Sequence, residues 1–352
     1  MGHARSTGPE SLLLRRKRFW FGLLVSLAFL AVFLYRTDFT GISKAFGQAD
    51  YALALASVPL YFLGFWLRTI RWRLLLRPVA DVTSLRLYPI VLIGLMANNV
   101  LPARVGEIVR AYLVGERESV SKSSALGTIA VDRVFDGLTL VAILGAVTAF
   151  SGSDARVTGI GVGTAGLFAG AAGVLVLLAF SPGWGKRWLF RLLSWLPARL
   201  EATALRPIDA FLEGLGSLRS PSALLQAGAL SFLSWLTEAA MYYIVGQAFS
   251  LDVGFHVYLL ITAAANLALS VLASPGGVGP FEVTTQAILI DLFSVPEPTA
   301  SAYAIVLHAI LLAPVIVVGF ALLWAAQLSL SEALGGQRLP PAKALPAPPT
   351  VE

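Results

Sequence analysis

The sequence lacks cysteine and has only three histidines. Without cysteine the chain has no disulfide framework, no thiolate metal site and no cysteine nucleophile, while the redox compartment stays open. His3, His256 and His308 do not have the spacing of metal ligands. We therefore expect no metal ion and no other cofactor.

The motifs of nucleotide-driven and hydrolytic proteins are also absent. The chain has no GxxxxGK[ST] phosphate loop, so any transport is passive, ion-coupled or driven by consumption elsewhere. It has no GxSxG elbow, and we expect no enzyme activity. The net charge of +6 comes without a nucleic-acid-binding motif, so no nucleic-acid partner is expected.

Charge is scarce and apolar residues are abundant. Only 13% of the residues are charged, against roughly 25% in an average soluble domain, and 57% are hydrophobic. This composition predicts an all-α, integral membrane domain over residues 15–330. Residues 1–14 and the Pro-rich residues 331–352 are expected to be disordered cytoplasmic ends.

Several apolar runs approach the ~20 residues that a helix needs to cross a bilayer. The basic cluster Arg15–Arg18 precedes the run 19–35, which we interpret as an uncleaved anchor rather than a signal peptide. Further crossings are predicted at 51–67, ending at Arg68, and at 125–150, 159–180, 224–249 and 301–327. Residues 181–222 are predicted to be a cytoplasmic connector with an amphipathic stretch, either interfacial or packed as a surface helix.

Two further apolar regions, 87–101 and 258–292, are interrupted by NNVLPARVGE and SPGGVGPFE. Non-helical backbone at membrane depth is tolerated only where protein or a water-filled cavity satisfies it. If both regions are re-entrant hairpins, about six full crossings remain and nearly all basic residues fall on the cytoplasmic side. The hairpins then enter from opposite faces of the cell membrane, and both chain termini are cytoplasmic.

The two interruptions also resemble each other. Pro102 lies four residues before Gly106, and Pro275 lies four residues before Gly279. Each glycine is followed by an acidic residue, Glu107 or Glu282. Arg133 lies 26 residues after Glu107, and His308 lies 26 residues after Glu282. This pattern favours an inverted repeat, in which broken helices meet near the midplane.

The first interruption supplies candidate binding residues for an anion such as a phosphate. A helix that restarts after Pro102 directs its N-terminal amides toward the break, where they favour an anion. Arg104 adds a planar hydrogen-bond donor, unless its side chain only snorkels to the membrane interface. Candidates here are Asn98, Asn99, Pro102, Arg104, Gly106 and Glu107.

Three ionisable residues lie in one predicted span, within TIAVDRVFDGLTL. Asp132, Arg133 and Asp136 share or adjoin one helical face. A charge at the bilayer centre costs ~2.5–3.5 kcal/mol on insertion scales, so the trio must be compensated, for which Glu107 or Arg104 is suitable. The trio is either a substrate site or a structural ion cluster.

Further ionisable residues lie in other apolar stretches. Glu238 is a lone carboxylate that exchanges protons, binds a cation, or pairs with Arg133 or His308. His308 suits a proton relay, although a hydrogen-bonded core histidine explains it equally well. The second interruption completes the candidate set with Pro275, Gly276, Gly277, Gly279 and Glu282.

Three motifs in this order, NNVLPARVGEIVRAYLV, SKSSALGTIAVDRVFDGLTL and ASPGGVGPFE, resemble the lysylphosphatidylglycerol synthase transmembrane family. The likeness covers about residues 15–327 and departs only in having Asp132 where the family often has Glu. It implies lipid translocation, without the synthetic activity of members fused to a synthase module. On the family pattern the matching residues are Asn99, Pro102, Arg104, Gly106, Glu107, Asp132, Arg133, Asp136, Pro275, Gly276, Gly277, Gly279, Phe281 and Glu282.

The leading hypothesis is therefore a multi-pass flippase-like protein whose partner is a membrane lipid with an anionic headgroup, such as a phospholipid or polyprenyl phosphate. One rival is an accessory subunit that presents a lipid acceptor to a glycosyltransferase or aminoacyltransferase. The least favoured is a membrane-embedded enzyme that uses Glu107, Asp132 and Asp136.

Overall fold

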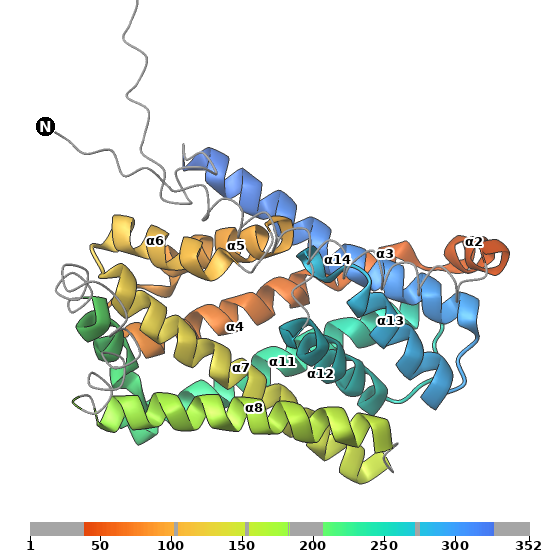
Figure 1. Ribbon diagram of the computed structural model, residues 1–352. Helices are drawn as coiled ribbons and strands as arrows, with labels where there is room; N and C mark the ends of the chain where they lie inside the picture. The colour runs from red at the N-terminus through yellow and green to blue at the C-terminus, as the bar shows by residue number, and fades with distance from the viewer. Residues whose placement is uncertain are drawn as a thin grey trace, which may run out of the picture.

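In the computed structural model, residues 39–101, 105–151, 155–181, 183, 207–271 and 275–326 are described, and every regular element among them is helical (Figure 1). This agrees with the all-α prediction. The α-helices are α2 (Phe39–Gln48), α3 (Tyr51–Ala56), α4 (Val58–Leu76), α5 (Ser84–Val100), α6 (Gly106–Glu118), α7 (Lys122–Ser151), α8 (Ala155–Phe180), α11 (Pro221–Ala248), α12 (Phe255–Val271), α13 (Pro280–Ala287) and α14 (Glu297–Ala325).

The centre of the bundle is built from α4, α7 and α11, which pack against one another. Small side chains allow α4 and α11 to approach closely, because a Cβ on Gly64 would lie 3.1 Å from Thr237 Oγ1. On the outside, α8 packs along α7 and leaves a row of large apolar side chains exposed, including Leu167, Val174 and Phe180. Such an apolar outer face suits a lipid environment.

The first interruption forms a tight antiparallel hairpin of α5 and α6. Asn98, in the last turn of α5, accepts a hydrogen bond from the Gly106 amide at 2.7 Å and donates one to Glu107 at 3.2 Å. The backbones touch, since a Cβ on Gly106 would collide with the carbonyl oxygen of Gly94. Val105 is the N-cap residue of α6, and the Asn98 side chain caps this helix from α5 by accepting from its first amide.

The second interruption separates α12 from α13. A short 3-10 turn, Pro275–Gly277, follows α12, and Gly276, Gly277 and Gly279 all have positive φ angles of 60°, 76° and 93°. Only glycine adopts such a succession without strain. Glu282 then caps α13 by accepting from the Gly279 amide at 2.7 Å, and α12 and α13 pack together as a second hairpin.

The two hairpins meet in the middle of the molecule. A Cβ on Gly276 would lie 3.2 Å from the carbonyl oxygen of Asn99, so the turn of one hairpin contacts the end of α5 in the other. In Figure 1 the open end of the α5–α6 hairpin lies at the left of the bundle, and that of the α12–α13 hairpin lies at the right. Two broken helices therefore enter the bundle from opposite ends.

Several predicted boundaries are wrong. The second apolar run does not stop at Arg68, because α4 continues through Arg71 and Arg73 to Leu76. Asn98 and Asn99 do not break a helix but belong to α5, which is continuous through Pro89. The anchor at 19–35, both predicted disordered ends and most of the connector lie outside the described residues. Amphipathic α2, which packs against α14, was not predicted.

Among the described residues, two continuous helical stretches are long and apolar enough to cross a bilayer, Tyr51–Leu76 and Glu297–Ala325. The shorter apolar helices include 84–100 and 255–270, the first arms of the two hairpins.

Gly106→Ala is expected to destabilise the protein, because the new Cβ would strike the Gly94 carbonyl and the Asn98 side chain. Overpacking of this kind typically costs ~1–3 kcal/mol. Gly145→Ala is the matched control, since nothing lies within 4 Å of its added Cβ and alanine favours a helix interior. In detergent, thermal unfolding should give a Tm below that of the native protein for Gly106→Ala but not for Gly145→Ala. Equal melting of the two variants would show that the hairpin is not tightly closed.

Candidate functional site

A cavity of about 520 Å³ lies where the two hairpins meet the central helices. Both hairpins contribute to its wall, which distinguishes it from a groove between neighbouring helices. Its lining is polar and charged on one part and apolar on the rest: Tyr61, Phe65, Arg68, Leu95, Asn98, Asn99, Glu107, Arg133, Asp136, Gly137, Leu140, Leu167, Phe168, Trp235, Glu238, Asn266, Leu269, Ser270, Gly276, Gly277 and Val315.

One wall of the cavity rests on a buried ion cluster centred on Arg71. Its Nε donates to Asp132 Oδ1 at 2.8 Å, and its Nη1 donates to Asp136 Oδ1 at 2.7 Å and to Ser231 Oγ at 2.7 Å. Arg71 is fully buried, and both carboxylates are nearly so. Since an unpaired charge at this depth is costly, the cluster joins α4, α7 and α11 through mutual neutralisation.

Two further arginines complete this cluster. Arg110, which stacks on the Trp72 ring at 4.2 Å, lies 3.4 Å from Asp132 Oδ2. Arg133 lies 2.9 Å from Asp132 and 3.2 Å from Asp136. The Arg133 side chain is 34% exposed, against 5% for Arg110 and 0% for Arg71. Arg133 is therefore the arginine of this cluster that lines the cavity.

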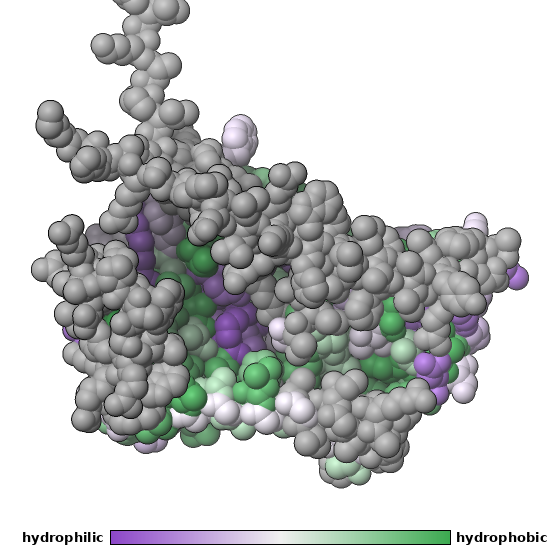
Figure 2. All heavy atoms as spheres, viewed as in Figure 1, coloured by the Kyte–Doolittle hydropathy of each residue, from purple (hydrophilic) through white to green (hydrophobic). Residues whose placement is uncertain are grey.

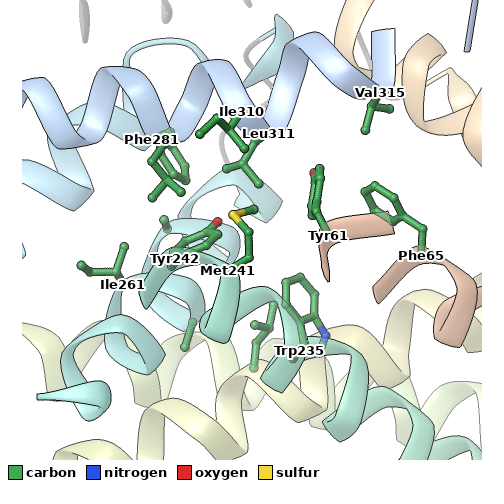
Figure 3. Close-up of a cluster of buried hydrophobic side chains, with 14 of the residues drawn as sticks. Tyr61, Phe65, Trp235, Met241, Tyr242, Ile261, Phe281, Ile310, Leu311 and Val315 are labelled. Atoms are coloured by element: carbon green, nitrogen blue, oxygen red, sulfur yellow. The ribbon is translucent and has the colours of Figure 1, made fainter. Parts of the chain in front are cut away.

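A second ion pair also lines the cavity. Arg68 donates to Glu238 at 2.7 Å, and its guanidinium stacks over the Trp235 ring at 4.1 Å. Asn266 on α12 also donates to Glu238, at 3.2 Å. Figure 3 shows Trp235 of α11 and Tyr61 of α4 in the space between α11 and α14. The faces of Phe65 and Trp235 thus add cation–π contacts to the guanidinium of Arg68.

The hairpins bring amides and glycines to the remaining wall. Asn98, Asn99 and Glu107 line it from the first hairpin, and Gly276 and Gly277 line it from the second. The amide of Gly106 is bonded to Asn98, so this first amide of α6 does not point at an anion as predicted.

His308 and Glu282 lie together behind the second hairpin. The ring Nδ1 is 2.6 Å from Glu282 Oε1, and Nε2 is 2.9 Å from the Gly276 carbonyl oxygen. The ring also stacks on Phe281, with centroids 4.6 Å apart. These side chains support the turn that borders the cavity without lining the cavity themselves.

The structure divides the predicted site residues into two groups. Those that line the cavity are Asn98, Asn99, Glu107, Arg133, Asp136, Glu238, Gly276 and Gly277. Those that hold the wall from behind are Gly106, Asp132, Gly279, Glu282 and His308, and Pro275 begins the second turn. Pro102 and Arg104 lie outside the described residues.

Two predicted pairings need correction. Glu238 bonds Arg68 rather than Arg133 or His308. Asp132 and Asp136 are compensated largely by Arg71, on another helix, whereas the predicted cation Arg104 lies outside the described residues. The two pairs with equal offsets differ in their contacts. Among the described contacts, Glu282 bonds His308, whereas Arg133 bonds Asp132 and not Glu107.

Sequence reasoning missed Arg68, Arg71 and Arg110, which were assigned to the cytoplasmic basic set, and Asn266. A weak signal existed, because Arg68 and Arg71 are three residues apart on one face of a helix that continues an apolar run. In the part of the chain that the structure describes, no group of three metal-ligating side chains is found.

Arg71→Met is expected to destabilise the protein strongly, because it leaves two buried carboxylates without their central partner. Breaking a buried ion pair in this way costs ~3–5 kcal/mol. Arg73→Met on the same helix is the control, since Arg73 pairs with the exposed Asp81 and its loss should change stability by less than ~0.5 kcal/mol. Thermal unfolding of both variants provides the comparison. A similar Tm for the two would contradict the central role of the cluster.

Comparison with known proteins supports the prediction that the chain is a membrane protein. The chain is 28% identical to the glycosyltransferase AglD of Haloferax volcanii over 89% of its own length, but it spans only 55% of that relative. It is 28% and 25% identical to two UPF0104 membrane proteins of Methanothermobacter thermautotrophicus, covering 83% and 88% of their lengths.

The family assignment rests on a match to a family model. A model of the lysylphosphatidylglycerol synthase TM region matches residues 19–319, which include both hairpins and the whole cavity. The resemblance seen in the three motifs is thereby confirmed, and the helical fold is that of a multi-pass membrane protein. The chain belongs to the lysylphosphatidylglycerol synthase transmembrane family.

Proposed function

We propose that the protein moves a lipid with an anionic headgroup between the two leaflets of the cell membrane. The observation that carries this proposal is the cavity at the junction of the two broken helices, with Arg133 partly exposed in its wall. Broken helices that meet around a polar site are the arrangement of secondary transporters. No enzymatic step is needed, since Asp132 and Asp136 are engaged with arginines.

The proposed membrane placement has about six full crossings and two re-entrant hairpins related as an inverted repeat. The α5–α6 hairpin dips in from the cytoplasm and the α12–α13 hairpin from the outside. This placement is supported by the opposite directions in which the hairpins enter the bundle (Figure 1). Their contact at Gly276 and Asn99 then lies at membrane depth, where the cavity supplies the polar surroundings that broken backbone requires.

The proposed anion binding depends on which of the balanced charges around the cavity is accessible. Around and directly behind it, Arg68, Arg71, Arg110 and Arg133 balance the carboxylates of Glu107, Asp132, Asp136 and Glu238. Because Arg133 is the most exposed of these arginines, it is the cation most accessible to a phosphate in the cavity. A phosphate can bind there without separating Arg71 from its carboxylates.

The cavity also borders an apolar flank. Leu167 and Phe168 of α8 line the cavity, and the Leu167 side chain is 59% exposed on the outer face. Figure 2 shows hydrophilic surface recessed among hydrophobic surface on this side of the molecule. A headgroup held near Arg133 can therefore leave its acyl chains against the apolar face. This geometry suits a lipid better than a soluble ion.

Glu107 gives the cavity a second recognition element. It lines the cavity beside Asn98 and Asn99, and its carboxylate accepts a hydrogen bond from Asn98. A carboxylate with remaining acceptor capacity can bind hydroxyl or ammonium groups of a headgroup. We propose that Glu107 orients the headgroup while Arg133 holds its phosphate.

The alternative function is presentation of a lipid acceptor to a transferase without transport. One observation favours it: a relative named as a glycosyltransferase, AglD, is nearly twice as long as the part that this chain matches. The same cavity would then hold the headgroup for a partner enzyme. Copurification with a transferase, together with no translocation across a broad lipid panel, would favour this alternative.

Arg133→Gln is expected to slow translocation by about tenfold or more, because a charge-assisted hydrogen bond contributes ~1.5–3 kcal/mol. The assay uses vesicles containing purified protein and phospholipids or polyprenyl phosphates with fluorescent reporters, and follows loss of outer-leaflet signal. Arg86→Gln is the matched control, since Arg86 is 70% exposed and pairs at the far end of α5. Arg133→Lys, which retains the charge balance, should keep part of the rate. Unchanged rates in Arg133→Gln would contradict the proposal.

A further inference from the structure

A buried histidine bridges the two parts of the second hairpin. His308 of α14 is 4% exposed, and it contacts Glu282 of α13 through Nδ1 and the carbonyl oxygen of Gly276 through Nε2. The distances are 2.6 Å and 2.9 Å, both within hydrogen-bonding range. One imidazole ring therefore connects the helix after the break to the turn that borders the cavity.

These two partners determine how many protons the site holds. The Gly276 carbonyl oxygen can only accept, so Nε2 must carry a hydrogen. An ionised Glu282 also only accepts, so the contact at Nδ1 needs a second hydrogen, either on the ring nitrogen or on the carboxyl group. The pair formed by His308 and Glu282 therefore holds one proton more than a neutral imidazole beside a carboxylate.

Loss of that proton removes one of the two hydrogen bonds. A neutral imidazole has a single N–H, which then serves either Glu282 or Gly276. The carboxylate is the stronger acceptor, and it is held in place by the Gly279 amide at 2.7 Å. The remaining hydrogen thus stays with Glu282, and the Nε2 lone pair faces the Gly276 carbonyl. Deprotonation releases the turn.

The released turn forms part of the cavity wall. Gly276 and Gly277 line the cavity, and Gly276 lies against the Asn99 backbone at the end of α5. Their positive φ angles mark a backbone that glycine allows to move between conformations. A change at His308 therefore acts on the contact between the two hairpins.

The other charged and titratable groups on the helices around α14 are not bonded to His308 in the described contacts. Arg68 and Glu238 bond each other, Arg71 bonds the carboxylates of α7, and Arg73 and Arg86 pair at the surface. The remaining titratable groups on the elements packed against α14, or on α14 itself, are Lys44, Tyr61, Tyr88, Asp291 and Glu297 together with the tyrosines Tyr242, Tyr243 and Tyr303. Within the described contacts, Glu282 is the charged group that bonds the His308 ring.

We propose that His308 and Glu282 form the binding site of a coupling proton, which fastens the turn of the second hairpin to α14 while bound and frees the turn when it leaves. The proton is taken from water and returned to water, and no other bond is made or broken. The inference rests on the proposed function for the coupling to lipid movement, whereas the response of the turn to protons does not.

The test measures how readily the turn is reached from water. Because the chain has no native cysteine, Val278→Cys, between Gly277 and Gly279, introduces a single thiol. Its labelling rate with a maleimide is divided by that of Asp252→Cys in an exposed loop, which cancels the pH dependence of thiol reactivity. When the pH is raised until the bound proton is lost, this ratio should rise about fivefold, because the histidine bond to Gly276 is lost with that proton.

Glu282→Gln is the matched variant. Its amide nitrogen donates to Nδ1 and its carbonyl oxygen accepts from the Gly279 amide, so a neutral His308 keeps its N–H on Gly276 at every pH. The ratio should therefore stay low and independent of pH. A pH-dependent ratio in this variant equal to that of the native background would overturn the proposal.

Val278→Cys with Glu282 and His308 unchanged gives a test that does not depend on whether Glu282→Gln folds. A labelling ratio that does not change with pH overturns the proton site, whatever the translocation assay shows. A ratio that rises with pH in protein that moves no lipid supports the proton site and contradicts the proposed transport. Retention of the rise in Arg133→Gln supports a proton site separate from headgroup binding.

Discussion

The contact between two broken helices is the constraint on which the rest of the structure depends. The end of α5 at Asn99 meets the glycine turn at Gly276, so two helices stop inside the bundle rather than crossing it. Backbone that stops at such a depth needs polar partners, which Asn98, Glu282 and His308 supply. The space that the two ends cannot fill is the cavity.

Charge compensation lowers the cost of burying ionised side chains in this interior. Arg71 neutralises Asp132 and Asp136 away from solvent, which leaves Arg133 of the same cluster partly exposed to the cavity. Under the proposed function, a structural ion cluster and a headgroup site are parts of one network rather than alternatives. The proposed proton site acts elsewhere, on the turn that closes the other wall. Headgroup binding and control of the wall are therefore assigned to different residues, although both depend on the same junction.

Prediction from sequence succeeded where the signal was local. Pro and Gly interruptions in apolar runs indicated both hairpins, and the intramembrane charges of α7 indicated one wall of the cavity. Partners from distant segments were not predictable: Arg71 lies 61 residues before Asp132, and the apolar run that carries it seemed to end at Arg68. Likewise Asn98 looked like a helix breaker, whereas its side chain caps the next helix. Such contacts depend on packing, which periodicity does not encode. The equal 26-residue offsets indicated only a repeat, and they did not predict that Glu282 and His308 bond each other.

The account depends most directly on the two hairpins entering the membrane from opposite faces. Asp81 lies in the exposed connection before α5, and Asp252 lies in the exposed connection before α12. In intact cells and inverted vesicles, an impermeant thiol reagent should label Asp81→Cys only from the cytoplasmic side and Asp252→Cys only from the outer side. Labelling of both positions from the same side would contradict the account, because the hairpins would then not meet from opposite faces around a shared cavity.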